Sequence, residues 1–461
     1  LLSLSTGKDG DGNLVHDDPL ISAIYADAQT RLREPRHLEQ MIKTLDQIDW
    51  FSAQKDGLGD LYEGLLEKNA NETKSGAGQY FTPRALINTM VSCLKPQPGE
   101  HIQDPAAGTA GFLIAAHEYI KSQTDDLYEL SDKDKTFQTT QAYVGIELVP
   151  GTRRLALMNC LLHGMEGDAE GVVHLGNALG QTGAGLEKAD LILANPPFGT
   201  SKGGDASITR DDLTYKTSNK QLAFLQHIYR NLKPGGRAAV VLPDNVLFEA
   251  GVGTDVRRDL MNKCNLHTIL RLPTGIFYAQ GVKTNVLFFT KGSAANKNQE
   301  ENCTEHVWVY DLRTNMPSFG KRTPFGDQHL NPFEAVYGES PNGDSQRKEG
   351  EYSFHSEDIE LPEHSDENEG IDPRLAHSRW RSFSRQWIAE HKGDSLDISW
   401  LKDSDSVDAA NLPEPSVLAG EAMGELVQAL GELDALMREL GAEEEADGAR
   451  VLLQEVMGEV K

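Results

Sequence analysis

The tetrapeptide Asn195-Pro196-Pro197-Phe198 directly follows the apolar run ADLILA at 189–194, which we expect to form a buried strand. Ligands of open α/β sheets bind at the carboxyl ends of the strands, so this tetrapeptide lies where chemistry is expected. The Asn195 side-chain oxygen and the Pro196 carbonyl can accept the two hydrogens of an exocyclic amine, and Phe198 can stack on a planar base. The alternative is a proline-rich turn that only ends a strand, and the position after a buried strand disfavours it.

A second candidate site is the small-residue run DPAAGTAGF at 104–112, between a short strand and a predicted helix. Small side chains let the backbone approach a nucleoside closely, and the helix presents free N–H groups. A nicotinamide-dinucleotide site requires GxGxxG and an acid about 20 residues later, and neither the glycine spacing nor the distance to Glu147 agrees. Glu147 ends the predicted strand 142–146 and could accept both ribose hydroxyls of a nucleoside. An ordinary solvated acid at a strand end is the alternative.

The third candidate is GAGQYFTPR at 76–84. Thr82 followed by Pro83 predicts a helix N-cap with proline in the first turn. The exposed N–H groups of that helix could hold a small carboxylate, such as that of a methionine moiety, and Tyr80 and Phe81 could line the pocket. Taken alone, the segment is equally typical of an ordinary capped helix.

The elements that position these residues follow from hydrophobic periodicity. Short apolar runs alternate with helix-like segments, which predicts a doubly wound, mostly parallel α/β sheet of seven strands. We place these strands at 100–103, 142–146, 172–175, 189–194, 237–242, 266–272 and 284–290. Apolar residues at spacings of three and four predict helices within 20–72 and from residue 415 onwards. The polar stretches 122–141 and 293–305 are predicted to be surface loops.

The periodicity suggests four domains or segments. We expect 1–75 to be the remainder of an N-terminal helical domain, because the chain begins Leu-Leu-Ser without Met and native sequence is expected to be missing there. Residues 76–335 are predicted to form the catalytic domain. Residues 336–410 combine an acidic linker with a basic, aromatic segment, and 411–461 are predicted to form a helical tail. The apolar stripe of this tail favours an interface over a free surface helix, and packing on its own domain is the alternative.

Composition excludes some classes of protein. With 44 basic and 71 acidic residues, the net charge of −27 opposes direct binding to a polyanion. Either the substrate is a small molecule, or a basic partner supplies affinity for nucleic acid. Four scattered cysteines indicate neither disulfides nor a zinc site and fit the cytoplasm. No apolar run is long enough to span a bilayer, and no GxxxxGK[ST] motif for nucleotide hydrolysis is present.

The motifs GQYFTPR, DPAAGTAGF, GIELVPGTRRLALMN, LGNAL and NPPFG occur in the order of amino-methylating DNA methyltransferases. With LKPGGRAAVVLPDNVLFE and LPTGIFYAQGVKTNVLFF, the chain closely resembles the modification subunit of type I restriction-modification systems. The resemblance implies the sheet of S-adenosylmethionine-dependent methyltransferases. It also implies an enzyme that methylates the N6 amine of a flipped adenine without a metal. It assigns catalysis to Asn195, Pro196, Pro197 and Phe198. It assigns cofactor binding to Gln79, Tyr80, Phe81, Thr82, Pro83, Arg84, Asp104, Gly108, Thr109, Ala110, Gly111, Glu147 and Asn177.

Two positions depart from the pattern of that family. Asn177 falls where many relatives carry an acid that holds the cofactor adenine amine, and an amide oxygen can accept the same bond. Ala110 replaces a common glycine, which we expect to be a small change for a backbone contact.

The resemblance also implies partners: DNA, a specificity subunit flanked by two modification subunits, and a motor-nuclease restriction subunit. The nearest alternative is a methyltransferase of another planar amine, a protein glutamine or an RNA guanine, because such enzymes also use an NPP-aromatic motif. A further alternative is an assembly subunit that no longer catalyses, which the intact NPPF and glycine-rich motifs disfavour.

Overall fold

The computed structural model describes residues 2–26, 32–47, 62, 64, 82–198, 208–277, 282–320, 323–349 and 378–401. Expectations for Gln79, Tyr80 and Phe81, for the linker at 350–377 and for the tail 411–461 lie outside these residues. By chain contacts the protein divides into the unit Leu1–Lys402 and the unit Asp403–Lys461. All of the second unit lies outside the described residues.

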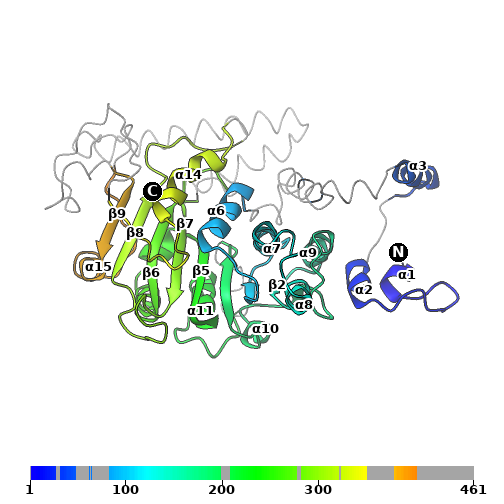
Figure 1. Cartoon of the computed structure of the whole chain (residues 1–461), viewed down its shortest axis with the longest axis horizontal. Helices are drawn as coiled ribbons and strands as arrows, with labels where there is room; N and C mark the ends of the chain where they lie inside the picture. Colours follow the sequence, from blue (N-terminus) through cyan, green and yellow to red (C-terminus); the bar gives the residue numbers. More distant parts are fainter. Residues whose placement is uncertain are drawn as a thin grey trace, which may run out of the picture. The chain divides into compact units, whose positions relative to one another are not determined.

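A nine-stranded sheet forms the centre of the first unit, with the order β3-β2-β1-β4-β5-β7-β6-β8-β9 (Figure 1). The strands are β1 (Ile102–Asp104), β2 (Tyr143–Glu147), β3 (Val173–Leu175), β4 (Ala189–Ala194), β5 (Leu232–Pro243), β6 (Cys264–Arg271), β7 (Thr284–Lys291), β8 (His306–Asp311) and β9 (Trp380–Ser384). Strands β1 to β5 pair in parallel, whereas β7 is antiparallel to both β5 and β6. All seven predicted strands are present, and β8 and β9 extend the sheet beyond the prediction.

Helices cover both faces of the sheet, as predicted. In chain order they are α1 (Leu2–Thr6), α2 (Pro19–Tyr25), α3 (Pro35–Asp46), α6 (Arg84–Leu94), α7 (Gly111–Gln123), α8 (Asp132–Thr140), α9 (Pro150–Leu162), α10 (Gln181–Ala184), α11 (Lys220–Asn231), α12 (Asn245–Phe248), α13 (Val252–Lys263), α14 (Asp327–Tyr337) and α15 (Arg385–Lys392). The prediction of a loop at 122–141 is wrong, because Ser131 caps the polar helix α8 through its hydroxyl. The stretch 293–305 contains no helix or strand, in agreement with the prediction.

The alternation of side chains along each central strand builds two hydrophobic cores. On β4, Leu191 and Leu193 pack with residues of α6, α7, α9 and α14. Ile192 and Ala194 point to the other face and pack with residues of α11, α13 and α15. Burial on both faces explains why these strands are almost wholly apolar. Among the described residues, no helix is both long and apolar enough to cross a membrane.

The predicted N-terminal helical segment is only partly helical in the described residues. Helix α2 packs on the main core through the buried Ile24, and its N-cap is Asp18. In α3 the apolar residues predicted to form a stripe remain 41–48% exposed, namely Leu38, Met41, Ile42 and Leu45.

The basic, aromatic segment is part of the folded core. Trp380 in β9 is fully buried, and the Arg381 side chain lies over the rings of Phe383 and Trp400. The buried Arg379 donates to the main-chain oxygen of Asp311 at 2.8 Å. These arginines therefore stabilise the edge of the sheet.

Candidate functional site

The three sequence motifs meet at one edge of the sheet. Asp104 is the last residue of β1, Glu147 the last of β2, and Asn195 follows β4 directly. Because β1 pairs in parallel with both β2 and β4, the carboxyl ends of all three strands lie together. The chain also reverses its direction of winding here, from β3 back to β4 beside β1. This edge is where an open α/β sheet is expected to bind its ligand.

The glycine-rich loop passes close to the end of β2. The Gly108 N–H donates to Glu147 Oε2 at 3.0 Å, and the Ala107 N–H donates to the Ile146 oxygen at 2.9 Å. A Cβ on Gly145 would lie 2.8 Å from the Ala107 Cβ, so β2 needs glycine at this point. The loop is thus a narrow backbone cradle between β1 and β2.

Ala110 adopts a left-handed conformation, with φ of 69° and ψ of 20°. Glycine adopts this conformation without strain, whereas an alanine pays about 1–2 kcal/mol there. The substitution of the family's glycine is therefore more than a small change for a backbone contact. The side chain is fully buried at the start of α7, where it packs in the main core.

Asp104 is buried, and its Oδ1 accepts a hydrogen bond from the Ala106 N–H at 2.9 Å. Burial raises the pKa of Asp104 to about 7, and the charge of Glu147 acts in the same direction. A buried carboxylate beside a second acid is stabilised by a cation, because the positive charge offsets both effects. The two carboxylates at the ends of β1 and β2 therefore fit a ligand with a cationic group.

Glu147 uses both carboxylate oxygens to hold the backbone. Oε1 accepts from the Val149 N–H at 2.7 Å, and Oε2 accepts from Gly108. Burial raises the pKa of Glu147, and these two hydrogen bonds partly offset the rise. Each carboxylate oxygen can accept a further bond, so ribose hydroxyls can still be bound. Glu147 is therefore more than a solvated acid at a strand end.

Asn177 lies two residues beyond β3, on the outer side of Glu147. Its Oδ1 accepts from the Leu179 N–H at 2.9 Å, which forms a local turn. The turn fixes the position of the side chain, whose amide oxygen is of the acceptor type that an amine hydrogen requires.

The Asn195 side chain is buried, and its Nδ2 donates to Thr82 Oγ1 at 2.9 Å. This hydrogen bond joins two residues 113 positions apart in the chain. The Pro197 carbonyl accepts from Gln221 Nε2 at 3.0 Å. Gln221 belongs to the first turn of α11, whose N-cap is Asn219. The turn of the tetrapeptide is thus fixed by Thr82, which precedes α6, and by Gln221 of α11.

Phe198 is partly buried and packs edge-on against Phe277, with ring centroids 5.8 Å apart and planes at 83°. Phe277 lies in the connection between β6 and β7. Sequence analysis assigned no role to Gln221 or Phe277. Phe277 stands in the quoted motif LPTGIFYAQG, but no local pattern relates it to Phe198, because the contact is tertiary.

The predicted cap at Thr82 is wrong. Helix α6 begins at Arg84 with Pro83 as its N-cap, and no side chain caps it. The Thr82 hydroxyl is bonded to Asn195 instead. The segment 82–84 therefore lies at the site, as expected. Thr82, however, contacts Asn195 of the tetrapeptide and does not cap the helix. In the described part of the chain no cluster of three His, Cys, Asp or Glu side chains could hold a metal.

Comparison with known proteins identifies the family. Residues 53–382 match the family model of N-6 DNA methylases, and residues 412–455 match the C-terminal domain of type I restriction enzyme methylase subunits. The chain is 63% identical over 458 residues to the StySPI methylase subunit of Salmonella potsdam, covering 97% of this chain and 86% of that protein. The EcoKI methylase subunit of Escherichia coli (strain K12) gives the same identity and coverage.

The crystal structure of the EcoKI M protein has a TM-score of 0.69 at 59% identity, covering 95% of this chain and 84% of that one. These relatives do not support methylation of a protein glutamine or an RNA guanine. The chain belongs to the N-6 DNA methylase family as a methylase subunit of the type I restriction enzymes, and it is an S-adenosylmethionine-dependent adenine N6-methyltransferase of DNA.

Proposed function

We propose that the carboxyl edge of β1, β2 and β4 binds S-adenosylmethionine beside a flipped adenine, with Asn195 to Phe198 presenting the N6 amine. The observation that carries this assignment is the hydrogen bond from Asn195 to Thr82. It joins the tetrapeptide Asn195 to Phe198, which we call the target-amine motif, to the segment predicted to hold the cofactor. Both lie at the edge of the sheet where Glu147 accepts from Gly108.

The residues at this edge fit the cofactor. Gly108 and Gly145 leave the cradle free of side chains. Glu147 supplies acceptors for the ribose hydroxyls, and Asn177 accepts from the adenine amine. Asp104, whose carboxyl is buried, pairs with the cationic amino-acid end. Thr109, Ala110 and Gly111 line the cradle, and we assign the remaining cofactor contacts to Gln79, Tyr80, Phe81, Thr82, Pro83 and Arg84.

When bound, the cofactor supplies a methyl group made electrophilic by its cationic sulfonium. The chain aligns the nucleophile. Asn195 and Pro196 accept the two amine hydrogens, which directs the nitrogen lone pair out of the ring plane, and Pro197 stiffens the turn. Phe198 stacks on the extruded base, which costs about a few kcal/mol to remove from the duplex. Alignment of two reactants can account for much of the rate enhancement.

We further propose that the chain obtains its DNA from partners. Its net charge of −27 leaves few groups to neutralise phosphates. As a type I methylase subunit it is expected to assemble in the cytoplasm with a specificity subunit, two methylase chains to one. A restriction subunit completes the complex, and methylation then protects host DNA. The sequence 411–461 carries an apolar stripe with 12 acids and 3 bases, and we assign this tail to subunit assembly.

Transfer of a labelled methyl group tests the reaction. The assembled complex should label unmethylated DNA but not RNA or protein. Asn195→Ala should abolish labelling while S-adenosylmethionine binding stays within a few-fold. Near-normal turnover in that variant would contradict the role of Asn195.

Removal of residues 415–461 tests the assembly. The truncated chain should bind S-adenosylmethionine normally but lose the specificity subunit, and methylation should fall because DNA is no longer delivered. Normal assembly of the truncated chain would show that the tail is not an interface.

A further inference from the structure

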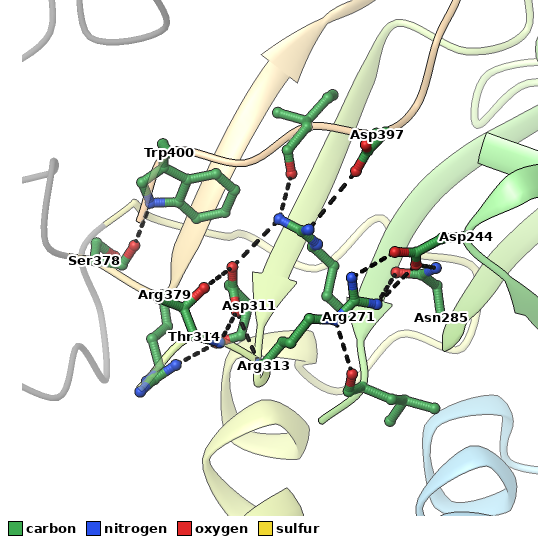
Figure 2. Close-up of polar contacts among 12 residues, drawn as sticks. Asp244, Arg271, Asn285, Asp311, Arg313, Thr314, Ser378, Arg379, Asp397 and Trp400 are labelled. Atoms are coloured by element: carbon green, nitrogen blue, oxygen red, sulfur yellow. Dashed lines mark hydrogen bonds and ion pairs between the residues drawn. The ribbon is translucent and has the colours of Figure 1, made fainter. Parts of the chain in front are cut away.

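Arg313 follows β8 at the carboxyl edge of the sheet, which we call the catalytic edge, and its guanidinium binds several groups there through all three of its nitrogens. Its Nη1 and Nη2 atoms form a bidentate pair with the Asp244 carboxylate, both at 2.8 Å. Its Nε donates to the Leu272 oxygen at 3.0 Å, and Nη2 also donates to the Thr284 oxygen at 2.9 Å. Figure 2 shows this guanidinium facing Asp244 and Asn285, which lie next to each other; the side-chain oxygen of Asn285 is 3.3 Å from Nη2.

The two main-chain oxygens held by Arg313 flank one connection. Leu272 directly follows β6 and Thr284 begins β7, and the Leu272 N–H donates to the Thr284 oxygen at 3.0 Å. Arg313 therefore closes the base of the β6–β7 connection. Burial opposes ionisation of Asp244, but the hydrogen bonds and charge of Arg313 hold the pKa of this carboxyl below its usual value.

The described residues 272–277 lead from Arg313 to the target-amine motif. Beyond Leu272, the Thr274 oxygen accepts from the Phe319 N–H at 3.1 Å. Gly275, with a φ of +83°, packs so closely that a Cβ would lie 2.1 Å from the Phe319 oxygen. Phe277 follows, 3% exposed, with its ring against Phe198. The segment is thus fixed at Leu272 and at Thr274–Gly275, and these contacts set the position of the Phe277 ring that follows.

We propose that Arg313 is a positioning residue for methyl transfer, which acts by fixing segment 272–277 so that Phe277 sets the angle of the Phe198 ring against the flipped base. The proposal rests on the stacking role assigned to Phe198 above. The hydrogen bonds that Arg313 makes here go to residues of the chain itself, so its effect on transfer is indirect. Lysine cannot reproduce these contacts, because its three N–H donors are on a single nitrogen, whereas Arg313 uses Nε, Nη1 and Nη2 in a planar fork that matches the carboxylate.

The chain contains a matched control in the middle of β5. Arg237 forms a bidentate pair with Glu100 at 2.6 and 2.9 Å and donates to the main-chain oxygens of Leu94 and Lys95. The side chains of this pair are 7% and 19% exposed, against 10% and 20% for Arg313 and Asp244. The two arginines thus have the same chemistry and similar burial, but Arg237 lies within β5, about six residues before the strand ends at Pro243 on the catalytic edge.

The test uses the full chain assembled with its specificity subunit, on unmethylated DNA whose target adenine has been mapped. We expect Arg313→Lys to lower kcat at least tenfold, with KM and Kd for S-adenosylmethionine within twofold. With 2-aminopurine in place of the target adenine, the variant complex should fluoresce more brightly, because a misplaced Phe198 ring stacks less well. Arg237→Lys should lower Tm by a similar amount while kcat stays within twofold.

A double variant separates positioning from general destabilisation. If Arg313 acts through Phe277, Arg313→Lys should reduce kcat less than twofold further in a Phe277→Leu background. Independent, multiplicative losses would overturn the proposal, as would equal kcat losses in the Arg313 and Arg237 variants. Should Arg313→Lys fail to fold, Phe277→Leu alone carries the test, because it leaves the arginine in place. Unchanged turnover and fluorescence in Phe277→Leu would overturn the proposal.

Phe198→Ala separates the stacking role of Phe198 from the positioning role of Arg313. Normal turnover in Phe198→Ala would overturn the stacking role itself. A strong loss in Phe198→Ala, together with normal turnover in Arg313→Lys, would overturn only the role of Arg313.

Discussion

Replacing Thr82 by valine removes the hydroxyl that orients Asn195 while nearly preserving the volume of the side chain. Both residues are 7% exposed, so water cannot readily replace the lost bond. Depriving a buried polar group of its partner costs about 1–3 kcal/mol. If that cost falls on the alignment of the amide in the transition state, kcat should fall roughly five- to 150-fold.

Single-turnover methylation by the assembled complex measures this loss, with calorimetry for S-adenosylmethionine binding. Thr82→Ser keeps the hydroxyl and should retain most activity. Thr89→Val is the matched control, because Thr89, in the helix α6 that follows Thr82, is also buried and donates to Glu334. It should lower stability without a specific loss of kcat.

Kd for S-adenosylmethionine and kcat together show whether the Thr82 hydroxyl orients Asn195 or serves the cofactor. A weaker Kd for S-adenosylmethionine with unchanged kcat in Thr82→Val would show that the hydroxyl serves the cofactor and not Asn195. Equal kcat in Thr82→Val and the wild type would show that the bond does not orient the amide during catalysis.

Three further predictions concern the cofactor cradle and the stacking ring. Glu147→Ala should weaken S-adenosylmethionine binding tenfold or more by calorimetry, since a charge-assisted hydrogen bond contributes about 1.5–3 kcal/mol and Gly108 also loses its acceptor; unchanged affinity would contradict the assignment. The pKa of Asp104 is raised to about 7 in the native state. The unfolded chain releases this proton near pH 4, so the contribution of Asp104 to the free energy of unfolding falls as the pH rises from about 4 to 7. The Tm of Asp104→Asn relative to the wild type should therefore increase from pH 5 to pH 8, and a constant difference would refute the shift. Phe198→Ala should lose more activity than Phe198→Trp, since base stacking tolerates another aromatic ring; equal losses would indicate packing instead.

Local patterns were sufficient for the central sheet and for the order of its motifs. The central predicted strands are apolar because both of their faces are buried, and such runs are visible without any tertiary information. Asp104, Glu147 and Asn195 each stand at the end of such a run. In a parallel sheet the ends of neighbouring strands must meet, so their common edge could be inferred.

Elements stabilised by other forces escaped prediction. Helix α8 has a polar sequence and forms with Ser131 as its cap, so it shows no apolar stripe. Strand β9 contains Trp380 and Arg381 side by side, which suggests a surface segment. The arginine is nevertheless buried, because the rings of Phe383 and Trp400 receive its guanidinium.

The sequence by itself determined which residue types stand at the catalytic edge, because strand periodicity and turn chemistry are local. Tertiary structure alone decided which of them touch. Thr82 is equally suited to cap a helix or to bond a distant amide, and only the approach of Asn195 selects the second role. The contacts of Phe277 with Phe198 and of Arg313 with Leu272 and Thr284 likewise depend on connections between strands that pair far apart in the chain. Side-chain hydrogen bonds and ring contacts act over a few ångströms, so their partners are set by the fold and not by sequence spacing.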